Sequence, residues 1–224
     1  MQTVKDIRIA LAQKLKNQDF VIDKSGSKTI EILGATFKAD EPYIIREPNE
    51  DYIQRELAWY QSQSLNVNDI PGTTPKIWLD VSSTKNEINS NYGWCVWSKD
   101  NGDQYDNVLK ELKRNPNSRR AVMIYNRPSM HVDYNKDGMS DFMCTYANGF
   151  FVRNGKLVSH YMMRSNDLVL GYNNDAAWAM YVHEKLANDL KIPKGDLIWT
   201  ASSAHVYERH FHHIEKWAND NLYR

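Results

Sequence analysis

Two cysteines and a few arginines are the residues that could carry covalent chemistry in this 224-residue chain. Cys144 lies in the segment DFMCTY, and Arg119-Arg120 and Arg164-Ser165 fall close to the ends of predicted strands. Guanidinium groups match phosphate oxygens in pairs, and their positive field would lower the pKa of a nearby thiol. A cysteine beside such a phosphate pocket would be a thiolate nucleophile. From these residues alone, the alternative that the arginines form ordinary surface ion pairs stays open.

Three other features look like chemical sites but favour a structural explanation. Cys95, between two large apolar residues, is typical of a packed core cysteine. The segment 133–138, DYNKDG, begins like a calcium-binding loop, but the twelfth position, which requires a bidentate Glu, is Cys144. The histidines at 210–213 lack the accompanying ligands of a zinc site and are typical of a solvated helix end. We therefore predict no metal site.

Composition and charge exclude several classes of protein. The chain has 28 Lys+Arg against 28 Asp+Glu, a balance that argues against general affinity for nucleic acid. No apolar run approaches membrane-spanning length, and residues 1–20 lack the apolar core of a signal peptide. We expect a soluble protein of the reducing cytoplasm that does not bind membranes.

The elements that would position these residues can be read from periodicity. Val4, Ile7 and Leu11 predict an opening helix, and Asn49 is a helix N-cap. Asn154-Gly155 predicts a tight hairpin between two strands over 142–164. The other predicted elements are a strand that follows the Gly/Ser loop within 23–37, helices over 104–114, 176–190 and 206–221, a buried strand over 121–125, and a strand over 195–201. Helices and strands are mixed without regular alternation, which predicts an α+β fold in one domain, 1–224.

Several segments of the chain resemble, in the same order, the motif series of thymidylate synthases. They are DKSGSKTIEILGATF, RELAWY, NYGWCVW, NPNSRRAVMIY, DFMCTYANGFF, MRSNDLVLGYNNDAAW and AHVYERH. The resemblance extends from about residue 17 to residue 211 and is closer still to the phage-type deoxycytidylate hydroxymethylases of that family. It implies a thymidylate-synthase-like fold, with a large mixed β-sheet flanked by helices and a homodimer packed through the sheet.

The resemblance also implies a mechanism. Cys144 would add to carbon 6 of the pyrimidine of dCMP, so that carbon 5 can attack the methylene group of the cosubstrate 5,10-methylenetetrahydrofolate. Glu56, in RELAWY, matches the glutamate that organises water and assists proton transfers, and Tyr92 matches a tyrosine of the proton-relay network. A hydroxymethylase then adds water to the exocyclic methylene, where a synthase reduces it with hydride.

The remaining site residues follow from the same resemblance. Arg164 and Ser165 would hold the nucleotide phosphate, together with Arg119 and Arg120 from the neighbouring subunit. Lys24 falls where the family has a cationic phosphate ligand, usually Arg. The other matches are His205 and Tyr207 for the deoxyribose hydroxyl, Asp167 for the pterin ring and Trp78 for the folate side of the site.

Asp175 is the predicted selector of the base. Synthases that use deoxyuridylate have Asn in this register, and an amide can donate to the uracil carbonyl and accept from its ring N–H. Cytosine presents an amino donor beside a bare ring nitrogen, which a carboxyl group sharing one proton can match. The alternatives left open are an Asp favoured only by a helix N-terminus, and a register error involving Asn173 or Asn174.

Two departures from the synthase pattern bear on the reaction. Met143-Cys144-Thr145 replaces Pro-Cys-His, and the chain ends in NLYR, without the apolar tail that closes over folate. A looser closure would admit water to the methylene intermediate, as hydroxymethylation requires. The alternatives are a thymidylate synthase or a hydroxymethylase acting on dUMP or CMP and, in another class, an inactive nucleotide-binding relative. Protein partners in a nucleotide-synthesis complex stay open.

Overall fold

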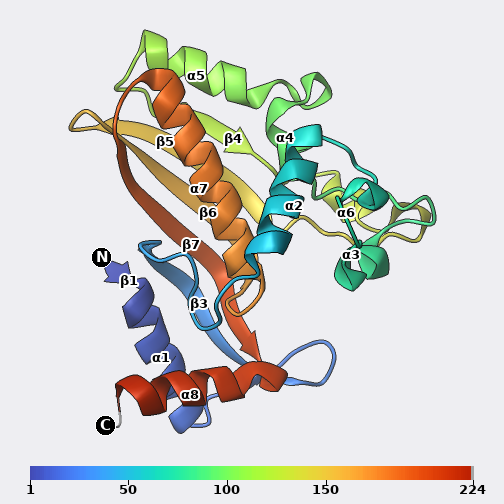
Figure 1. The fold of residues 1–224 in the computed structure, drawn as a ribbon, viewed down its shortest axis with the longest axis vertical. Coiled ribbons are helices and arrows are strands. Elements are labelled where there is room, and N and C mark those ends of the chain that lie inside the picture. The colour runs from blue at the N-terminus through green and yellow to red at the C-terminus, as the bar shows by residue number, and fades with distance from the viewer. Residues whose placement is uncertain (223–224) are drawn as a thin grey trace.

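A mixed seven-stranded sheet organises residues 1–222, which are the residues that the computed structural model describes (Figure 1). The strand order is β1-β3-β7-β6-β5-β4, with β2 paired to β3 off this path. The pairs β1–β3 and β6–β7 are parallel and the others are antiparallel. The strands are β1 (Gln2–Thr3), β2 (Val21–Ile22), β3 (Lys28–Lys38), β4 (Val122–Ile124), β5 (Thr145–Arg153), β6 (Lys156–Asp167) and β7 (Lys194–Tyr207).

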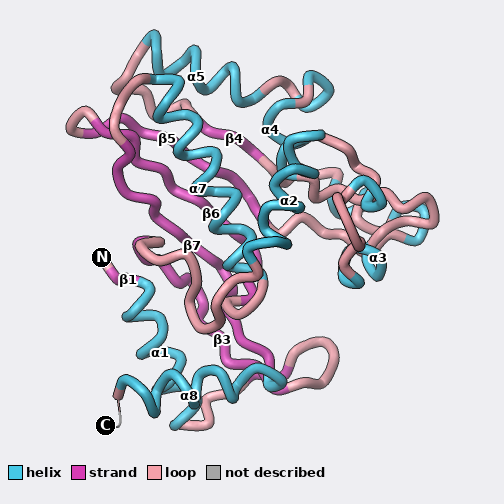
Figure 2. Tube along the Cα trace, in the orientation of Figure 1, coloured by secondary structure: helices cyan, strands magenta, loops and turns pink. Residues whose placement is uncertain are grey.

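Helices cover one face of this sheet and one end of it (Figures 1 and 2). The α-helices are α1 (Val4–Lys16), α2 (Glu50–Ser62), α3 (Lys76–Val81), α4 (Tyr92–Trp97), α5 (Gln104–Arg114), α6 (Met130–Asp133), α7 (Gly171–Leu190) and α8 (Phe211–Asn221). Helix α7 connects the parallel strands β6 and β7 and packs against both, and its side chains Trp178 and Leu186 are fully buried. The α+β fold with a mixed sheet flanked by helices is the one predicted.

Local sequence explains where the key elements begin and turn. Asn49 accepts a hydrogen bond from the backbone N–H of Tyr52 at 3.1 Å, so α2 begins where the N-cap was predicted. Asn154 and Gly155 have φ values of 51° and 72°, the left-handed pair that a two-residue hairpin requires. This turn sets the register of β5 against β6, and therefore the placement of Cys144 beside Arg164.

The helices α2 and α4 meet at their backbones. A Cβ built on Gly93 would lie 1.7 Å from the carbonyl oxygen of Tyr60, so only glycine permits this approach. The side chain of Asn91, the N-cap of α4, donates to the carbonyl oxygen of Trp59 at 3.1 Å. The two helices that carry Glu56 and Tyr92 are therefore fixed against each other.

Three sequence predictions need correction. The strand at 121–125 was predicted to be buried, but Val122 and Ile124 are 37% and 54% exposed and only one face of β4 packs on the core. The helix predicted at 176 begins at Gly171, because tertiary contacts hold its first turn: Tyr172 and Asn173 donate hydrogen bonds at 3.0 Å to the backbone carbonyl oxygens of Glu41 and Arg46. Val206 and Tyr207 belong to β7 rather than to the closing helix, which begins at Phe211.

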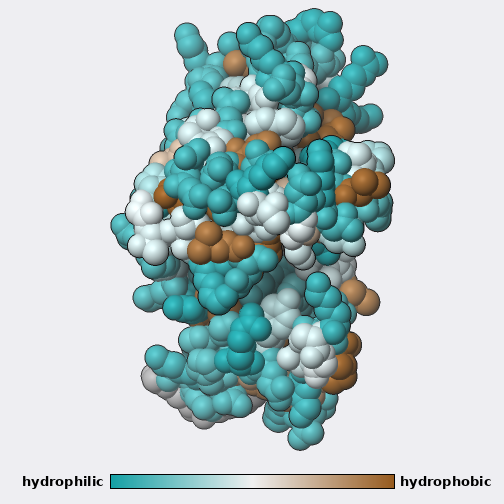
Figure 3. Space-filling view, turned by 90° about the vertical axis from the view of Figure 1, so that its right-hand side faces the viewer, coloured by the Kyte–Doolittle hydropathy of each residue, from teal (hydrophilic) through white to brown (hydrophobic). Residues whose placement is uncertain are grey.

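No helix among residues 1–222 is long and apolar enough to cross a membrane. The face beside α3 and α6 is mostly hydrophilic, and its apolar side chains form small separate patches (Figure 3). The last two residues of the NLYR ending lie outside the described residues. Part of the prediction about closure over folate concerns these residues.

Candidate active site

Cys144 lies immediately before β5, opposite the end of β6 that carries Arg164. The backbone N–H of Arg164 donates to the carbonyl oxygen of Cys144 at 2.7 Å. The guanidinium Nη2 of Arg164 lies 3.6 Å from the Sγ of Cys144 and 3.2 Å from the carbonyl oxygen of Phe142. The predicted pair of nucleophile and phosphate-binding cation is therefore brought together.

The electrostatics of this thiol differ from the sequence prediction. Burial raises the pKa of Cys144 to about 11, although Arg164 acts in the opposite direction. The carboxyl groups of Asp175 and Asp141 raise the pKa of the thiol further. Arg164 does lower the pKa of the thiol, as predicted. The net pKa is nevertheless raised and not lowered, because the desolvation of the buried thiol outweighs the charge of the arginine. The free thiol therefore keeps its proton at neutral pH.

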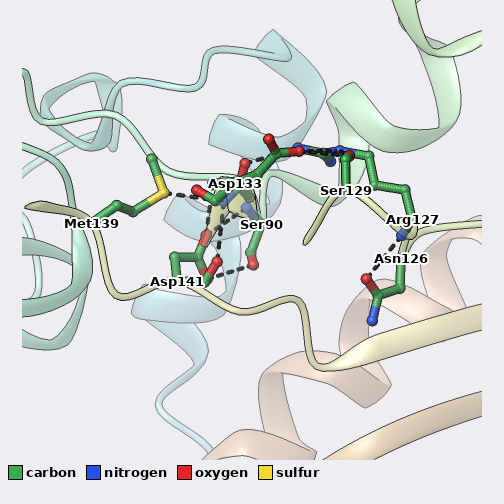
Figure 4. Close-up of polar contacts among 8 residues, drawn as sticks. Ser90, Asn126, Arg127, Ser129, Asp133, Met139 and Asp141 are labelled. Atoms are coloured by element: carbon green, nitrogen blue, oxygen red, sulfur yellow. Dashed lines mark hydrogen bonds and ion pairs between the residues drawn. The ribbon is translucent and has the colours of Figure 1, made fainter. Parts of the chain in front are cut away.

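A buried polar network holds the segment that leads into Cys144 (Figure 4). Asp141 accepts hydrogen bonds from the backbone N–H of Asn89 at 2.7 Å, from that of Ser90 at 2.8 Å and from the Ser90 hydroxyl at 2.7 Å. Arg127 pairs with Asp133 at 2.8 Å. Asp133 belongs to the segment that resembles the start of a calcium-binding loop, and its carboxylate forms an ion pair with Arg127.

Glu56 lies on the buried face of α2. Its Oε1 accepts from the hydroxyl of Tyr52 at 2.5 Å and from the indole Nε1 of Trp78 at 3.2 Å, and the side chain of Asn174 is a further partner. Burial raises the pKa of Glu56 to about 7, and these hydrogen bonds limit the rise. A carboxyl group with such a pKa can both accept and donate a proton near neutral pH.

Asp175 lies in the first turns of α7, facing α4 and β6. Its Oδ1 accepts from the hydroxyl of Tyr92 at 3.3 Å, and its Oδ2 accepts from the Nδ2 of Asn166 at 3.0 Å. Burial, together with the charges of Glu56 and Asp167, raises the pKa of Asp175 to about 8. The carboxyl group therefore retains a proton at neutral pH.

His205 and Tyr207 lie at the end of β7, beside the end of β6. Their rings are 5.0 Å apart and nearly perpendicular, and His205 pairs with Asp167 in the β6–β7 register. The Oδ1 of Asp167 accepts from the backbone N–H of Val169 at 2.8 Å. Burial raises the pKa of Tyr207, with Asp167 contributing in the same direction. Ser165 is two residues before Asp167 on β6 and pairs with Ser203.

Three predicted phosphate ligands are not brought together with Cys144 in this chain. Arg119 and Arg120 are exposed and precede β4. The adjoining Ala121 accepts from the backbone N–H of Phe150, six residues along β5 from Cys144, or roughly 20 Å at about 3.3 Å per residue. Lys24 is exposed in the loop between β2 and β3.

Several residues of this site were not predicted from the sequence. Tyr52 is four residues before Glu56, a spacing that places both on one helix face and could have indicated the pair. Asn166 is two residues after Arg164 and points to the same side of β6. Thr145 was noted only as a departure from the family pattern. No group of three or more His, Cys, Asp or Glu side chains within residues 1–222 could hold a metal ion.

Known proteins match this chain over nearly its whole length. The family model described as thymidylate synthase matches residues 11–223. The deoxycytidylate 5-hydroxymethyltransferase of Enterobacteria phage T2 is 56% identical over 224 residues, which cover 97% of this chain and 91% of that protein. The enzyme of the same name from Enterobacteria phage T4 is 56% identical over 222 residues, covering 96% of this chain and 90% of that protein.

Among solved structures, the thermostable thymidylate synthase A of Bacillus subtilis superposes with a TM-score of 0.75. It is 23% identical in sequence, and the match covers 98% of this chain and 84% of that one. At this identity the likeness concerns the fold alone.

Proposed function

The chain belongs to the thymidylate synthase family, and on that premise we propose that it is a deoxycytidylate 5-hydroxymethyltransferase. The observation that carries the proposal is the buried Asp175, a protonatable carboxyl group whose charge is felt by the thiol of Cys144. The 56% identity to two phage enzymes of that name supports the same assignment.

The nucleotide would be held by groups at the ends of β6 and β7. Arg164 and Ser165 would bind the phosphate, and His205 and Tyr207 the deoxyribose hydroxyl. Arg164 now donates to backbone carbonyls of the segment before Cys144, and it would exchange these for phosphate oxygens. Lys24, which is exposed in the loop before β3, would have to approach the phosphate when the nucleotide binds.

The residues on the other side of Glu56 fit a folate. Methylenetetrahydrofolate would supply the one-carbon unit. Trp78 packs edge-on against Trp59 with ring centroids 5.3 Å apart and forms part of an aromatic wall. Asp167 offers a carboxylate to the N–H donors of a pterin ring.

The chemistry assigned to the chain begins at Cys144. Its thiol would lose a proton on substrate binding and form a bond from Sγ to carbon 6 of cytosine, which makes carbon 5 nucleophilic. Carbon 5 would take up the one-carbon unit, and loss of the carbon 5 proton together with departure of tetrahydrofolate from the transferred carbon would leave an exocyclic methylene. Water would add to this methylene, and Sγ would then be eliminated from carbon 6. Glu56, with a pKa near 7, would orient that water and accept its proton.

A product assay tests this function. The purified protein is incubated with labelled methylenetetrahydrofolate and either dCMP, CMP or dUMP, and the products are identified by mass spectrometry. We expect 5-hydroxymethyl-dCMP and tetrahydrofolate from dCMP at the highest rate. A methylated nucleotide together with dihydrofolate would contradict the proposal.

We also propose that the active site is completed by a second copy of the chain. Arg119 and Arg120 lie too far from Cys144 to serve their own site, and Val122 and Ile124 expose an apolar face of β4 beside them. A two-fold homodimer packed through the sheet would bring the arginines to the neighbouring phosphate pocket.

Subunit complementation tests the shared site. Cys144→Ala and Arg120→Ala chains, each nearly inactive, are mixed after partial unfolding, and subunit exchange is confirmed by mass tagging. About half of the dimers are then mixed, so roughly a quarter of all sites should regain activity. A chain with both substitutions mixed with Cys144→Ala is the control and should stay inactive. No recovery in the first mixture would place the arginines in their own site.

A further inference from the structure

A chain of hydroxyl groups leads from the sheet interior to Asp175. The hydroxyl of Tyr92 donates to the Oδ1 of Asp175 at 3.3 Å. The hydroxyl of Thr145 donates to that of Tyr92 at 3.0 Å, and the hydroxyl of Tyr161 lies 3.1 Å from Thr145. Thr145 and Tyr161 are fully buried, so water does not compete for these contacts.

The direction of this chain follows from counting protons. Each hydroxyl group has one proton to donate. Because Thr145 gives its proton to Tyr92, the hydroxyl of Tyr161 must be the donor in its contact with Thr145. The hydroxyl of Tyr92 accepts from Thr145 and directs its own proton to Asp175, the other polar side chain that it contacts. The Oδ1 of Asp175 is thereby kept as an acceptor.

This direction matters because a protonated carboxyl group alone does not distinguish the two bases. With its proton facing the ring nitrogen it matches cytosine, which offers an amino donor and a bare nitrogen. With its proton facing the exocyclic carbonyl it matches uracil, which offers an acceptor and a ring N–H. The choice of base therefore depends on which of the two carboxyl oxygens carries the proton.

We infer that Thr145, acting through Tyr92, is a positioning residue that fixes the proton of Asp175 on Oδ2 and so selects cytosine over uracil. The inference rests on the proposed function and assigns Oδ1 to the amino group of cytosine. Asn166 limits the direction of that proton, because its Nδ2 donates to Oδ2 at 3.0 Å and the proton must then lie on the other side of Oδ2. The buried Oδ1 of Asn166 has no hydrogen-bond partner among residues 1–222. That oxygen is an unpaired acceptor close to Asp175.

The direct test replaces Thr145 with residues that keep or remove its hydroxyl group. Thr145→Val keeps the shape and removes the donor, so Tyr92 can turn its proton away from Asp175. We expect the ratio of kcat/KM for dCMP to that for dUMP to fall about tenfold, the worth of one ordinary hydrogen bond. Thr145→Ser restores the donor and should return the ratio to within about twofold of the wild-type value.

A matched pair of tyrosine substitutions separates this effect from a loss of packing. Tyr161→Phe removes the far end of the chain and should lower the ratio by a smaller factor, roughly threefold. Tyr125 is also buried, its ring is 5.9 Å from that of Tyr161, and its hydroxyl accepts from the indole of Trp178 at 3.0 Å. Tyr125→Phe should therefore lower the melting temperature and leave the ratio unchanged.

Each outcome decides the inference. A Thr145→Val protein with the wild-type ratio overturns it while leaving the proposed function intact. So does a Thr145→Ser protein as unselective as the Val variant, or an equal loss of selectivity in Tyr125→Phe. If the wild-type protein itself does not hydroxymethylate dCMP, the proposed function fails first and the inference falls with it.

Discussion

Two buried aspartates near Cys144 are held in different ways. Asp141 is 7% exposed and accepts three hydrogen bonds of 2.7 to 2.8 Å, two from backbone N–H groups and one from a hydroxyl. Asp175 accepts two longer ones, at 3.3 and 3.0 Å, both from side chains. Burial raises the pKa of both carboxyl groups.

The difference separates a structural carboxyl group from one prepared for a ligand. Asp141 accepts three short hydrogen bonds and two of their donors are fixed in the backbone, so it holds one conformation of the segment before Cys144. Asp175 retains hydrogen-bonding capacity and is set by side chains that can adjust. Removing Asp141 should therefore affect stability, and removing Asp175 should affect the choice of substrate.

The largest expected effect is at the residue that both carboxyl groups influence. Cys144→Ala should lower kcat by roughly three orders of magnitude or more, because the covalent step is lost. Nucleotide binding, measured by calorimetry, should change little, because the phosphate and sugar contacts remain. Substantial hydroxymethylation by this variant would contradict the covalent mechanism.

The structural half of the comparison is tested by Asp141→Asn. An amide cannot accept all three hydrogen bonds, so the free energy of unfolding should fall by about 2–4 kcal/mol. The base preference of the folded fraction should stay at the wild-type value. Asp133→Asn is the matched control, because its pair with Arg127 is partly exposed and is worth about 1 kcal/mol or less. Equal losses of stability in the two variants would remove the distinction.

The functional half is tested by Asp175→Asn. The amide should weaken the use of dCMP and raise that of dUMP, because each mispaired buried group costs about 1–3 kcal/mol. The ratio of catalytic efficiencies should shift by roughly one to two decades. An unchanged ratio would show that Asp175 does not read the base.

The smallest effect is a change in how stability depends on pH. The pKa of Glu56 is raised to about 7 and that of Asp175 to about 8, so between about pH 4 and 8 the folded protein holds protons that the unfolded chain has released. The free energy of unfolding therefore falls as pH rises through this window. In the double variant Glu56→Gln, Asp175→Asn, the fall between pH 7 and pH 8 should be smaller by on the order of 1–2 kcal/mol. Parallel curves for both proteins would show that these groups titrate normally.

Much of the fold could be predicted because local rules set it. Helix α1 follows from its apolar spacing, α2 from its N-cap, and the β5–β6 hairpin from Asn154-Gly155. The exposure of β4 could not be predicted, because an apolar run does not show which of its faces another element covers. The first turn of α7 was missed since GYNN is a poor helix start by propensity and is held by tertiary contacts.

Some contacts of the candidate site could likewise be predicted from the sequence, and others could not. The pairing of Cys144 with Arg164 and of Tyr92 with Asp175 agrees with the residues singled out by motif. Thr145 and Tyr161 were not predicted, because their role depends on hydroxyl groups that meet only when β5, β6 and α4 are assembled. The predicted direction of the Cys144 pKa was wrong, because the burial of a side chain depends on residues that are distant in the sequence.

The contact between α2 and α4 at Gly93 limits how this protein can be varied. Because a single added methyl group there would collide with the backbone of Tyr60, the position tolerates no substitution that leaves Glu56 and Tyr92 in their present relation. Asp175 and Thr145 carry side chains that can be exchanged for others of similar size. A mutant library aimed at a new pyrimidine substrate should therefore randomise those two positions and keep Gly93 constant.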